Sequence, residues 1–111
     1  MIDLAQKRCV PCEGGIPPLG KSEVEKLLAQ LAGWSLNDQW ITKEFSFKNF
    51  VVAMQFVNRV AEVAEGEGHH PDIHIHYNRV RFDIWTHAIG GLSENDFILA
   101  AKIDALSPNK I

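Results

Sequence analysis

Apolar residues recur at two different spacings between residues 21 and 106, and each change of spacing marks a new helix or strand. The first segment has a helical period that Gly33 would end, and its start matches a capping-box pattern at Ser22 and Glu25. The apolar positions of this predicted helix are Val24, Leu27, Leu28 and Leu31.

Two later segments have the same helical period. The second helix is predicted from about Lys48 to Ala64 with Gly66 as its terminator, and the third starts where Ser93 and Asp96 form a cap. Apolar stripes of this kind are typical of a core or a subunit interface rather than of a ligand site. The stripes comprise Phe50, Val51, Met54, Val57, Val60, Ala61 and Ala64 in the second helix, and Phe97, Leu99, Ala100, Ile103 and Leu106 in the third.

Aromatic and β-branched residues predict a β-hairpin between the first two helices. Its strands, Trp34 to Leu36 and Gln39 to Phe47, flank Asn37 and Asp38, two residues that tolerate turn geometry. The order helix, two strands, helix, two strands, helix indicates an α+β fold. We expect a single domain with a four-stranded antiparallel sheet and three helices packed on one face of it.

A second hairpin is predicted, with strands from Ile73 to Tyr77 and from Val80 to His87 around a turn at Asn78-Arg79. Apolar and polar residues alternate along these strands, so the two faces of the hairpin differ. With a two-residue turn, the pairs on the core face are Tyr77 with Val80, Ile75 with Phe82 and Ile73 with Ile84. On the opposite face the pairs are His76 with Arg81, His74 with Asp83 and, by extrapolation, His70 with His87. This register predicts that His70 and His87 approach each other at one end of the sheet, although Pro71 lacks a ladder donor.

Composition defines the class of protein. The chain has 111 residues, 46% of them hydrophobic, so it is large enough for one core and too short for two domains. Residues 1–20 contain Gly-Gly and Pro-Pro pairs and are predicted to be an N-terminal arm, followed by a folded domain over residues 21–111. No apolar run is long enough for a membrane span and no export signal is visible, so we expect a cytoplasmic protein.

Charge and cysteine content exclude some classes of partner. A formal net charge of −3 with scattered basic residues argues against direct nucleic-acid binding. Cys9 and Cys12 form a CxxC pair, but no second pair follows that would complete a zinc site. A reduced, solvent-accessible pair in the arm is the simpler interpretation.

Histidine is concentrated in one region of the chain. Four of the five histidines lie between residues 69 and 76, and His87 is predicted to return towards them. Because the ordinary pKa of histidine lies close to neutral, such a cluster can contain both a proton donor and a proton acceptor. A metal site is the alternative interpretation, but no Cys accompanies the cluster. His74 and His76 fit an ordinary polar sheet face and are left out of the catalytic set.

These histidines belong to a wider pattern of motifs. The segments that carry it are Glu65-Gly-Glu-Gly-His69-His70-Pro71, Tyr77, Thr86-His87, Gly91-Leu92-Ser93 and Asp96. The pattern resembles the signature of the pterin-4a-carbinolamine dehydratases. The resemblance covers residues 21 to 106 and implies an enzyme, a hydro-lyase acting on 4a-hydroxytetrahydrobiopterin in pterin recycling, that needs no metal and no organic cofactor.

The resemblance also assigns roles to residues. It implies that His69 and His87 are the acid–base pair, that His70 is a third catalytic residue placed against the reduced pterin, and that Glu65 and Asp96 are supporting acids. A carboxylate bonded to an imidazole would orient it, although capping alone would explain Asp96. The residues that the resemblance implies for substrate binding are Gly68, His69, His70, Pro71, Trp85, Thr86, His87 and Ala88.

Relatives of this fold leave a second function open. They include a dimerisation partner of a transcription factor and assembly factors, so a non-catalytic dimerisation or assembly factor is the alternative to the enzyme. Specialised sequences of that kind would be expected to lose catalytic histidines, whereas this chain retains all three. The resemblance implies a homodimer or homotetramer, and a small four-stranded sheet leaves edges that can pair.

Overall fold

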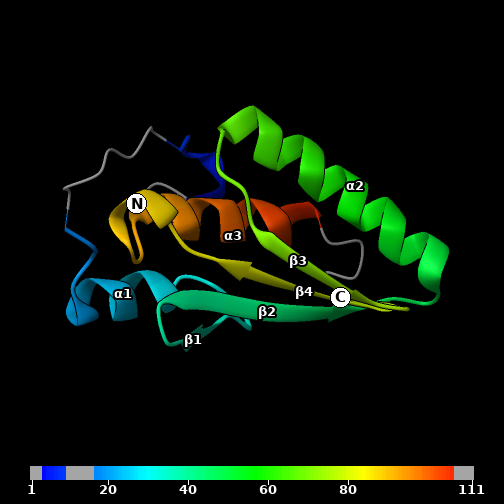
Figure 1. The fold of residues 1–111 in the computed structure, drawn as a ribbon, viewed down its shortest axis with the longest axis horizontal. Coiled ribbons are helices and arrows are strands. Elements are labelled where there is room, and N and C mark those ends of the chain that lie inside the picture. Colours follow the sequence, from blue (N-terminus) through cyan, green and yellow to red (C-terminus); the bar gives the residue numbers. More distant parts are fainter. Residues whose placement is uncertain (1–3, 10–16, 107–111) are drawn as a thin grey trace.

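The computed structural model describes residues 4–9 and 17–106, and its helices and strands follow the predicted order. The four strands form one antiparallel sheet in the order β1-β2-β4-β3, and in Figure 1 the long helix α2 and helix α3 lie side by side along it. The predicted α+β fold is therefore confirmed. The elements are η1 (Leu4–Gln6), α1 (Lys21–Leu28), β1 (Ser35–Asn37), β2 (Trp40–Ser46), α2 (Phe50–Glu67), β3 (Asp72–His76), β4 (Arg79–Ile84), η2 (His87–Ile89) and α3 (Glu94–Leu106).

The core lies between the helices and one face of the two central strands. α3 is buried on almost every side, because it packs against η1, α2 and α1, and its apolar residues belong to the same core cluster as those of the sheet. Removing each large apolar side chain from water contributes roughly 1.5–3 kcal/mol to stability. The strand residues on this face are Ile41, Phe45, Val80, Phe82 and Ile84, all buried. No helix in the described part of the chain is long and apolar enough to cross a membrane.

The C-terminal half of α3 is fixed to the sheet through Asp104. Both carboxylate oxygens of Asp104 lie 3.1 Å from Trp34 Nε1, and Lys43 Nζ donates to Asp104 Oδ1 at 2.8 Å. The same ammonium group donates to the carbonyl of Ala32 at 2.8 Å and lies 4.6 Å from the centre of the Phe45 ring. Asp104 therefore connects α3 to β2 and to the chain just before β1.

Helix α1 starts and ends earlier than the pattern predicts. Its N-cap is Gly20, whose N–H donates to the Glu23 carboxylate at 3.3 Å, so the capping pair is not Ser22 and Glu25. The regular helix ends at Leu28, and Gly33 follows five residues later with φ of 83°. The apolar spacing located this helix correctly but could not distinguish two overlapping capping patterns.

Helix α2 is one turn longer than predicted at its C-terminus. Asn49 caps its start by accepting the N–H of Val52 at 2.9 Å, and Gly68 ends it with φ of 66°, so Gly66 lies inside the last turn. The buried stripe is also rotated from the predicted one, because Phe50 and Val51 are exposed. The buried residues are Ala53, Phe56, Val57, Val60 and Ala64.

The second hairpin turns one residue earlier than predicted. His76 pairs with Arg79 across a turn made by Tyr77 and Asn78, with Tyr77 at φ of 55°. Asn78 Nδ2 donates to the carbonyl of Phe47, and Phe47 N–H donates to the carbonyl of Asn78. These two bonds to the chain after β2 hold Asn78 in the turn, which a reading of the hairpin alone cannot show.

This turn shifts every strand pair by two residues relative to the predicted register. Ile73 pairs with Phe82 and Ile75 with Val80, so an even shift leaves the core face unchanged. Tyr77, however, is 68% exposed and not on the core face. Asp72 pairs with Asp83, so the extrapolated partner of His70 is Trp85 rather than His87. The first hairpin, in contrast, turns one residue later than predicted, at Asp38 and Gln39 instead of Asn37 and Asp38.

Two glycines provide a test of this packing. A Cβ at Gly91 would lie 2.7 Å from Cβ of Pro18, whereas a Cβ at Gly66 would meet nothing within 4 Å. We expect Gly91→Ala to destabilise the protein by about 1–3 kcal/mol through overpacking, and Gly66→Ala to stabilise it by about 0.5–1 kcal/mol as a helix substitution. Urea unfolding of both variants measures the difference, and shifts in the same direction would contradict the packing described here.

Candidate active site

The centre of the candidate site is the carboxylate of Asp96, which is completely buried in the first turn of α3. Its Oδ2 accepts the N–H of Ser93 at 2.8 Å and the hydroxyl of Thr86 at 2.9 Å. Its Oδ1 lies 2.6 Å from Nε2 of His69. Asp96 therefore caps α3, as its spacing from Ser93 predicts, and also holds an imidazole. The two roles that the sequence leaves as alternatives occur together.

His69 reaches Asp96 because of the way α2 ends. Gly68 adopts a left-handed conformation, and the N–H of His69 then donates back to the carbonyl of Ala64 at 3.2 Å. The side chain of His69 is only 12% exposed. Because an ionised carboxylate can only accept, Nε2 carries the hydrogen of this bond, and Nδ1 is the ring nitrogen that this bond leaves free of Asp96.

Thr86 connects Asp96 to a closed loop after β4. Thr86 N–H donates to the carbonyl of Gly91 at 2.8 Å, and the carbonyl of Thr86 accepts from Ile89 and Gly91. Its hydroxyl donates to Asp96 and therefore accepts from Ser93 Oγ, 2.8 Å away. The polar groups of Thr86 thus hold the loop together, and a ligand would meet them only by displacing these bonds.

His87 and Ala88 lie beyond Thr86 in this loop, and both are exposed. The ring of His87 packs against the ring of Trp85, with centroids 4.1 Å apart and an interplanar angle of 48°. Gly90, at φ of 66°, turns the chain back towards α3. The loop therefore presents one imidazole beside an indole at the surface.

His70 makes a different kind of contact from its neighbour. Its Nε2 lies 2.7 Å from Oε2 of Glu65, but the two side chains are 59% and 81% exposed. An ion pair this exposed contributes little to stability, so the arrangement leaves His70 accessible to a ligand. The observed strand register no longer supports the predicted approach of His70 to His87, because it places His70 opposite Trp85. The approach stays a prediction.

The two histidines left out of the catalytic set lie on the sheet face opposite the core. His74 Nε2 is 3.0 Å from Oδ2 of Asp83, whose other oxygen accepts the hydroxyl of Thr42 at 2.6 Å. Arg81 also contacts Asp83, and His76 is exposed near the turn. These contacts belong to a polar sheet surface separate from Asp96.

Cys9 differs from the accessible thiol that the sequence predicts. It is half-buried, and its Sγ lies 3.6 Å from the carbonyl of Asn95. Burial, together with the nearby Glu67 carboxylate, raises the pKa of the Cys9 thiol to about 12. The reactive thiolate that redox or zinc chemistry requires is therefore disfavoured at Cys9. Cys12 lies outside the described residues, and within the described ranges no three His, Cys, Asp or Glu residues are grouped to hold a metal ion.

Comparison with known proteins assigns the chain to a family. The model of the family described as pterin 4 alpha carbinolamine dehydratase matches residues 17–106. The chain belongs to the pterin-4a-carbinolamine dehydratase family. The resemblance seen in the sequence is thereby confirmed, and the match begins at residue 17, slightly before the region of residues 21 to 106 that the resemblance covers.

Bacterial members of the family are similar to the chain over nearly its whole length. A protein of Nitrosomonas eutropha named "Putative pterin-4-alpha-carbinolamine dehydratase" is 59% identical over 107 residues, covering 96% of this chain and 95% of its own. A protein of Nitrosospira multiformis with the same name is 57% identical over 104 residues, covering 94% and 92%. The similarity therefore includes most of the N-terminal arm as well as the family domain.

A solved structure of a family member has the same fold. The crystal structure of a transcriptional coactivator/pterin dehydratase from Brucella melitensis superimposes with a TM-score of 0.77 and 37% sequence identity. It covers 80% of this chain and 97% of that one. The fold described above is thus the fold of a solved family member.

Two features of this dehydratase-family site are not evident from the sequence. Thr86 was expected to meet the substrate, but its hydroxyl and main chain bond within the protein. Glu67 had no predicted role, yet it accepts the N–H of Cys9 at 2.8 Å. No local pattern signals this contact, because the two residues are 58 positions apart in the chain.

The buried carboxylate gives a prediction for stability. In Asp96→Asn the amide has one acceptor oxygen and one NH2 group, so either Ser93 N–H and the Thr86 hydroxyl lose their acceptor or His69 must change to the tautomer whose Nε2 accepts, and the charge-assisted bonds are lost in both cases. We expect a loss of about 2–3 kcal/mol in the free energy of unfolding. The matched control is Glu94→Gln, an exposed residue paired with Lys7, which should change stability by less than about 0.5 kcal/mol. Chemical denaturation measures both, and equal effects would contradict the assigned role of Asp96.

Proposed function

We propose that the chain catalyses the dehydration of a 4a-hydroxytetrahydropterin, with 4a-hydroxytetrahydrobiopterin as the substrate in pterin recycling. The observation that carries the proposal is the His69–Asp96 pair, a buried carboxylate that orients an imidazole in a chain of this family. A histidine fixed in this way is suited to a proton transfer at a defined position.

The reaction requires one proton to be donated and one to be removed. The bond between C4a and the hydroxyl oxygen breaks, and a donated proton converts the leaving hydroxyl to water. The proton on N5 passes to a base, and the electron pair of the N5–H bond forms the C=N bond of the quinonoid dihydropterin. In our proposal His69 and His87 carry these two transfers, and His70 lies against the substrate. Neither a metal nor an organic cofactor is needed, because imidazoles can supply and accept both protons.

The loop after β4 and the end of α2 form the proposed binding surface. His87 and Ala88 are exposed, so their side of the loop can meet the pterin, while Thr86 holds the loop in place. Glu65 and Asp96 act as supporting acids through their contacts with His70 and His69. The full proposed binding set is Gly68, His69, His70, Pro71, Trp85, Thr86, His87 and Ala88, in which Thr86 contributes by holding the loop rather than by direct contact.

The proposal is tested by following the loss of 4a-hydroxytetrahydrobiopterin at neutral pH. We expect His69→Ala and His87→Ala each to lower kcat/KM by on the order of a hundredfold, the scale of a lost acid–base group. His76→Ala is the matched control, because this exposed histidine lies on the sheet face opposite the core, near the turn. The His76→Ala variant should keep wild-type activity.

A wild-type protein that does not accelerate the reaction over buffer would overturn the enzyme proposal. The alternative would then be a dimerisation or assembly factor, and the solved Brucella melitensis relative is titled a transcriptional coactivator as well as a pterin dehydratase. Recovery of one stoichiometric partner protein in a pull-down, together with absent dehydration, would favour that alternative.

We also propose that the protein is a cytoplasmic homo-oligomer, a dimer or a tetramer. The sheet ends at β1 and β3, and unpaired edge strands favour association. Apolar side chains at Phe50, Val51 and Tyr77 are exposed in the single chain. Sedimentation equilibrium at micromolar concentration should give a mass of two or four chains, and the mass of one chain would contradict the proposal.

A further inference from the structure

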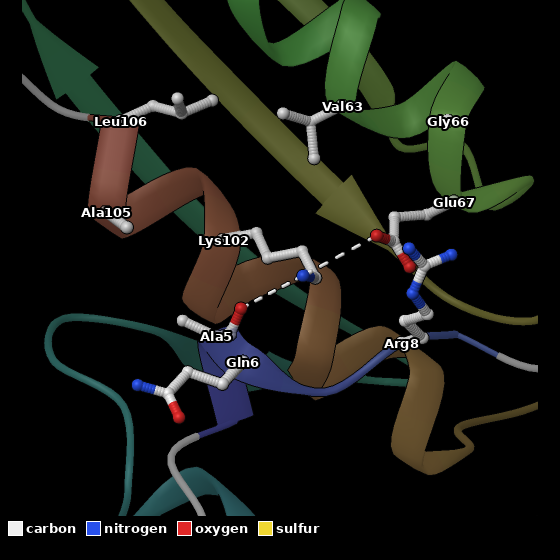
Figure 2. Close-up of a pocket in the computed structure, with 9 residues that line it drawn as sticks. All are labelled: Ala5, Gln6, Arg8, Val63, Gly66, Glu67, Lys102, Ala105 and Leu106. Atoms are coloured by element: carbon white, nitrogen blue, oxygen red, sulfur yellow. Dashed lines mark hydrogen bonds and ion pairs between the residues drawn. The ribbon is translucent and has the colours of Figure 1, made fainter.

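The N-terminal segment from Leu4 to Cys9 is bonded to the end of α2, close to the candidate site. Glu67 is the last residue of α2 and precedes His69 by two positions. Its Oε1 accepts the N–H of Cys9 at 2.8 Å, and its Oε2 lies 3.5 Å from Lys102 Nζ. Figure 2 shows Lys102 reaching between Glu67 and the carbonyl of Ala5, to which it donates at 2.9 Å.

The same segment is bonded to the start of α3. The thiol of Cys9 lies 3.6 Å from the carbonyl of Asn95, the residue before Asp96. Lys7 forms an ion pair with Glu94, one residue earlier. The segment therefore touches both places from which the His69–Asp96 pair is built.

The end of α2 and the C-terminal half of α3 leave a space between them. A pocket of about 510 Å³ is lined by both helices and by the N-terminal segment. In Figure 2, Val63 of α2 and Leu106 of α3 face this space, and the Glu67–Lys102 contact spans it. Beside this space, α2 and α3 are joined through Glu67, Lys102 and the carbonyl of Ala5.

We propose that Glu67, Lys102 and residues 4–9 form a brace that positions His69 against Asp96 for the proton transfer. This inference rests on the proposed dehydratase function. Within it, Glu67 and Lys102 are positioning residues and do not touch the substrate.

The electrostatics of Glu67 are consistent with this role. The N–H of Cys9, followed by the charge of Lys102, lowers the pKa of the Glu67 carboxyl, which therefore stays ionised at neutral pH. The side chains of Glu67 and Lys102 are only 16% and 18% exposed. A buried ion pair adds little net stability compared with apolar packing, and in some proteins such a pair specifies one arrangement of the chain.

A small displacement of His69 is enough to affect catalysis. Moving a reacting group by about 1 Å can lower a rate by as much as a hundredfold even when the change lies outside the reacting groups. Loss of the brace should therefore lower kcat by on the order of tenfold and leave KM within about twofold, because the substrate contacts are unchanged.

The test uses the full chain carrying Cys12→Ser, so that Cys9 is the single thiol. Glu67→Ala and Lys102→Met each remove one side of the brace. Glu67→Gln keeps an oxygen that can accept the N–H of Cys9, and Glu62→Ala removes an exposed carboxylate from the same helix as the matched control. Circular dichroism confirms that each variant is folded at the assay temperature.

Three measurements are made on every variant. Steady-state kinetics with 4a-hydroxytetrahydrobiopterin separates kcat from KM. The rate of Cys9 modification by a disulfide reagent, taken at a pH high enough to ionise the thiol in every variant, reports release of the segment, because the Glu67 carboxylate itself raises the pKa of this thiol. Proton NMR detects the ring N–H that His69 donates to Asp96.

We expect Glu67→Ala and Lys102→Met to lower kcat, speed Cys9 modification and weaken the His69 ring N–H signal, and Glu67→Gln to restore all three at least in part. Faster Cys9 modification with an unchanged kcat and an unchanged ring signal would overturn the proposal, since the segment would then only add stability. If the wild type shows no dehydration, the proposed function fails separately. The ring signal then decides on the brace: its loss in Glu67→Ala supports positioning and its retention excludes it.

Discussion

The buried carboxylate of Asp96 can exist only if three separate parts of the chain supply its hydrogen-bond donors. His69 comes from the end of α2, Thr86 from the loop after β4, and Ser93 from the residue before α3. A carboxylate taken out of water without such partners would be strongly unfavourable. The same hydrogen bonds therefore join α2, β4 and α3 and orient the proposed catalytic imidazole. A change that disturbs this junction also displaces the ring of His69.

Much of this arrangement could be predicted from the sequence, because periodicity depends on local geometry. Helical and alternating spacings gave the order of the helices and strands, and the Ser93–Asp96 spacing gave the start of α3. The family motif selected His69, His70 and His87 from the five histidines. The contact of Asp96 with Ser93 was predicted from the capping pattern, and the family resemblance also marked Asp96 as an acid beside a histidine.

The remaining features depend on contacts between residues far apart in the chain. The turn at Tyr77 and Asn78 is set by two bonds to Phe47, so the register could not be read from the hairpin alone. Glu67 lies among the motif residues without a predicted role, because its partners Cys9 and Lys102 come from opposite ends of the sequence. Thr86 was identified as important, but the direction of its hydroxyl, towards Asp96, is a property of the folded chain.

Helix α3 is attached at both ends by a carboxylate, Asp96 to the histidine and Asp104 to Trp34 and Lys43. Each residue added to an α-helix rotates the rest of that helix by about 100° and advances it by about 1.5 Å. An insertion or deletion of one residue between the two carboxylates would therefore turn one of them away from its partners, whatever amino acid was involved. The number of residues between Asp96 and Asp104 therefore fixes the angle between the two carboxylates around the helix axis. Substitutions between them keep this angle, whereas insertions and deletions change it.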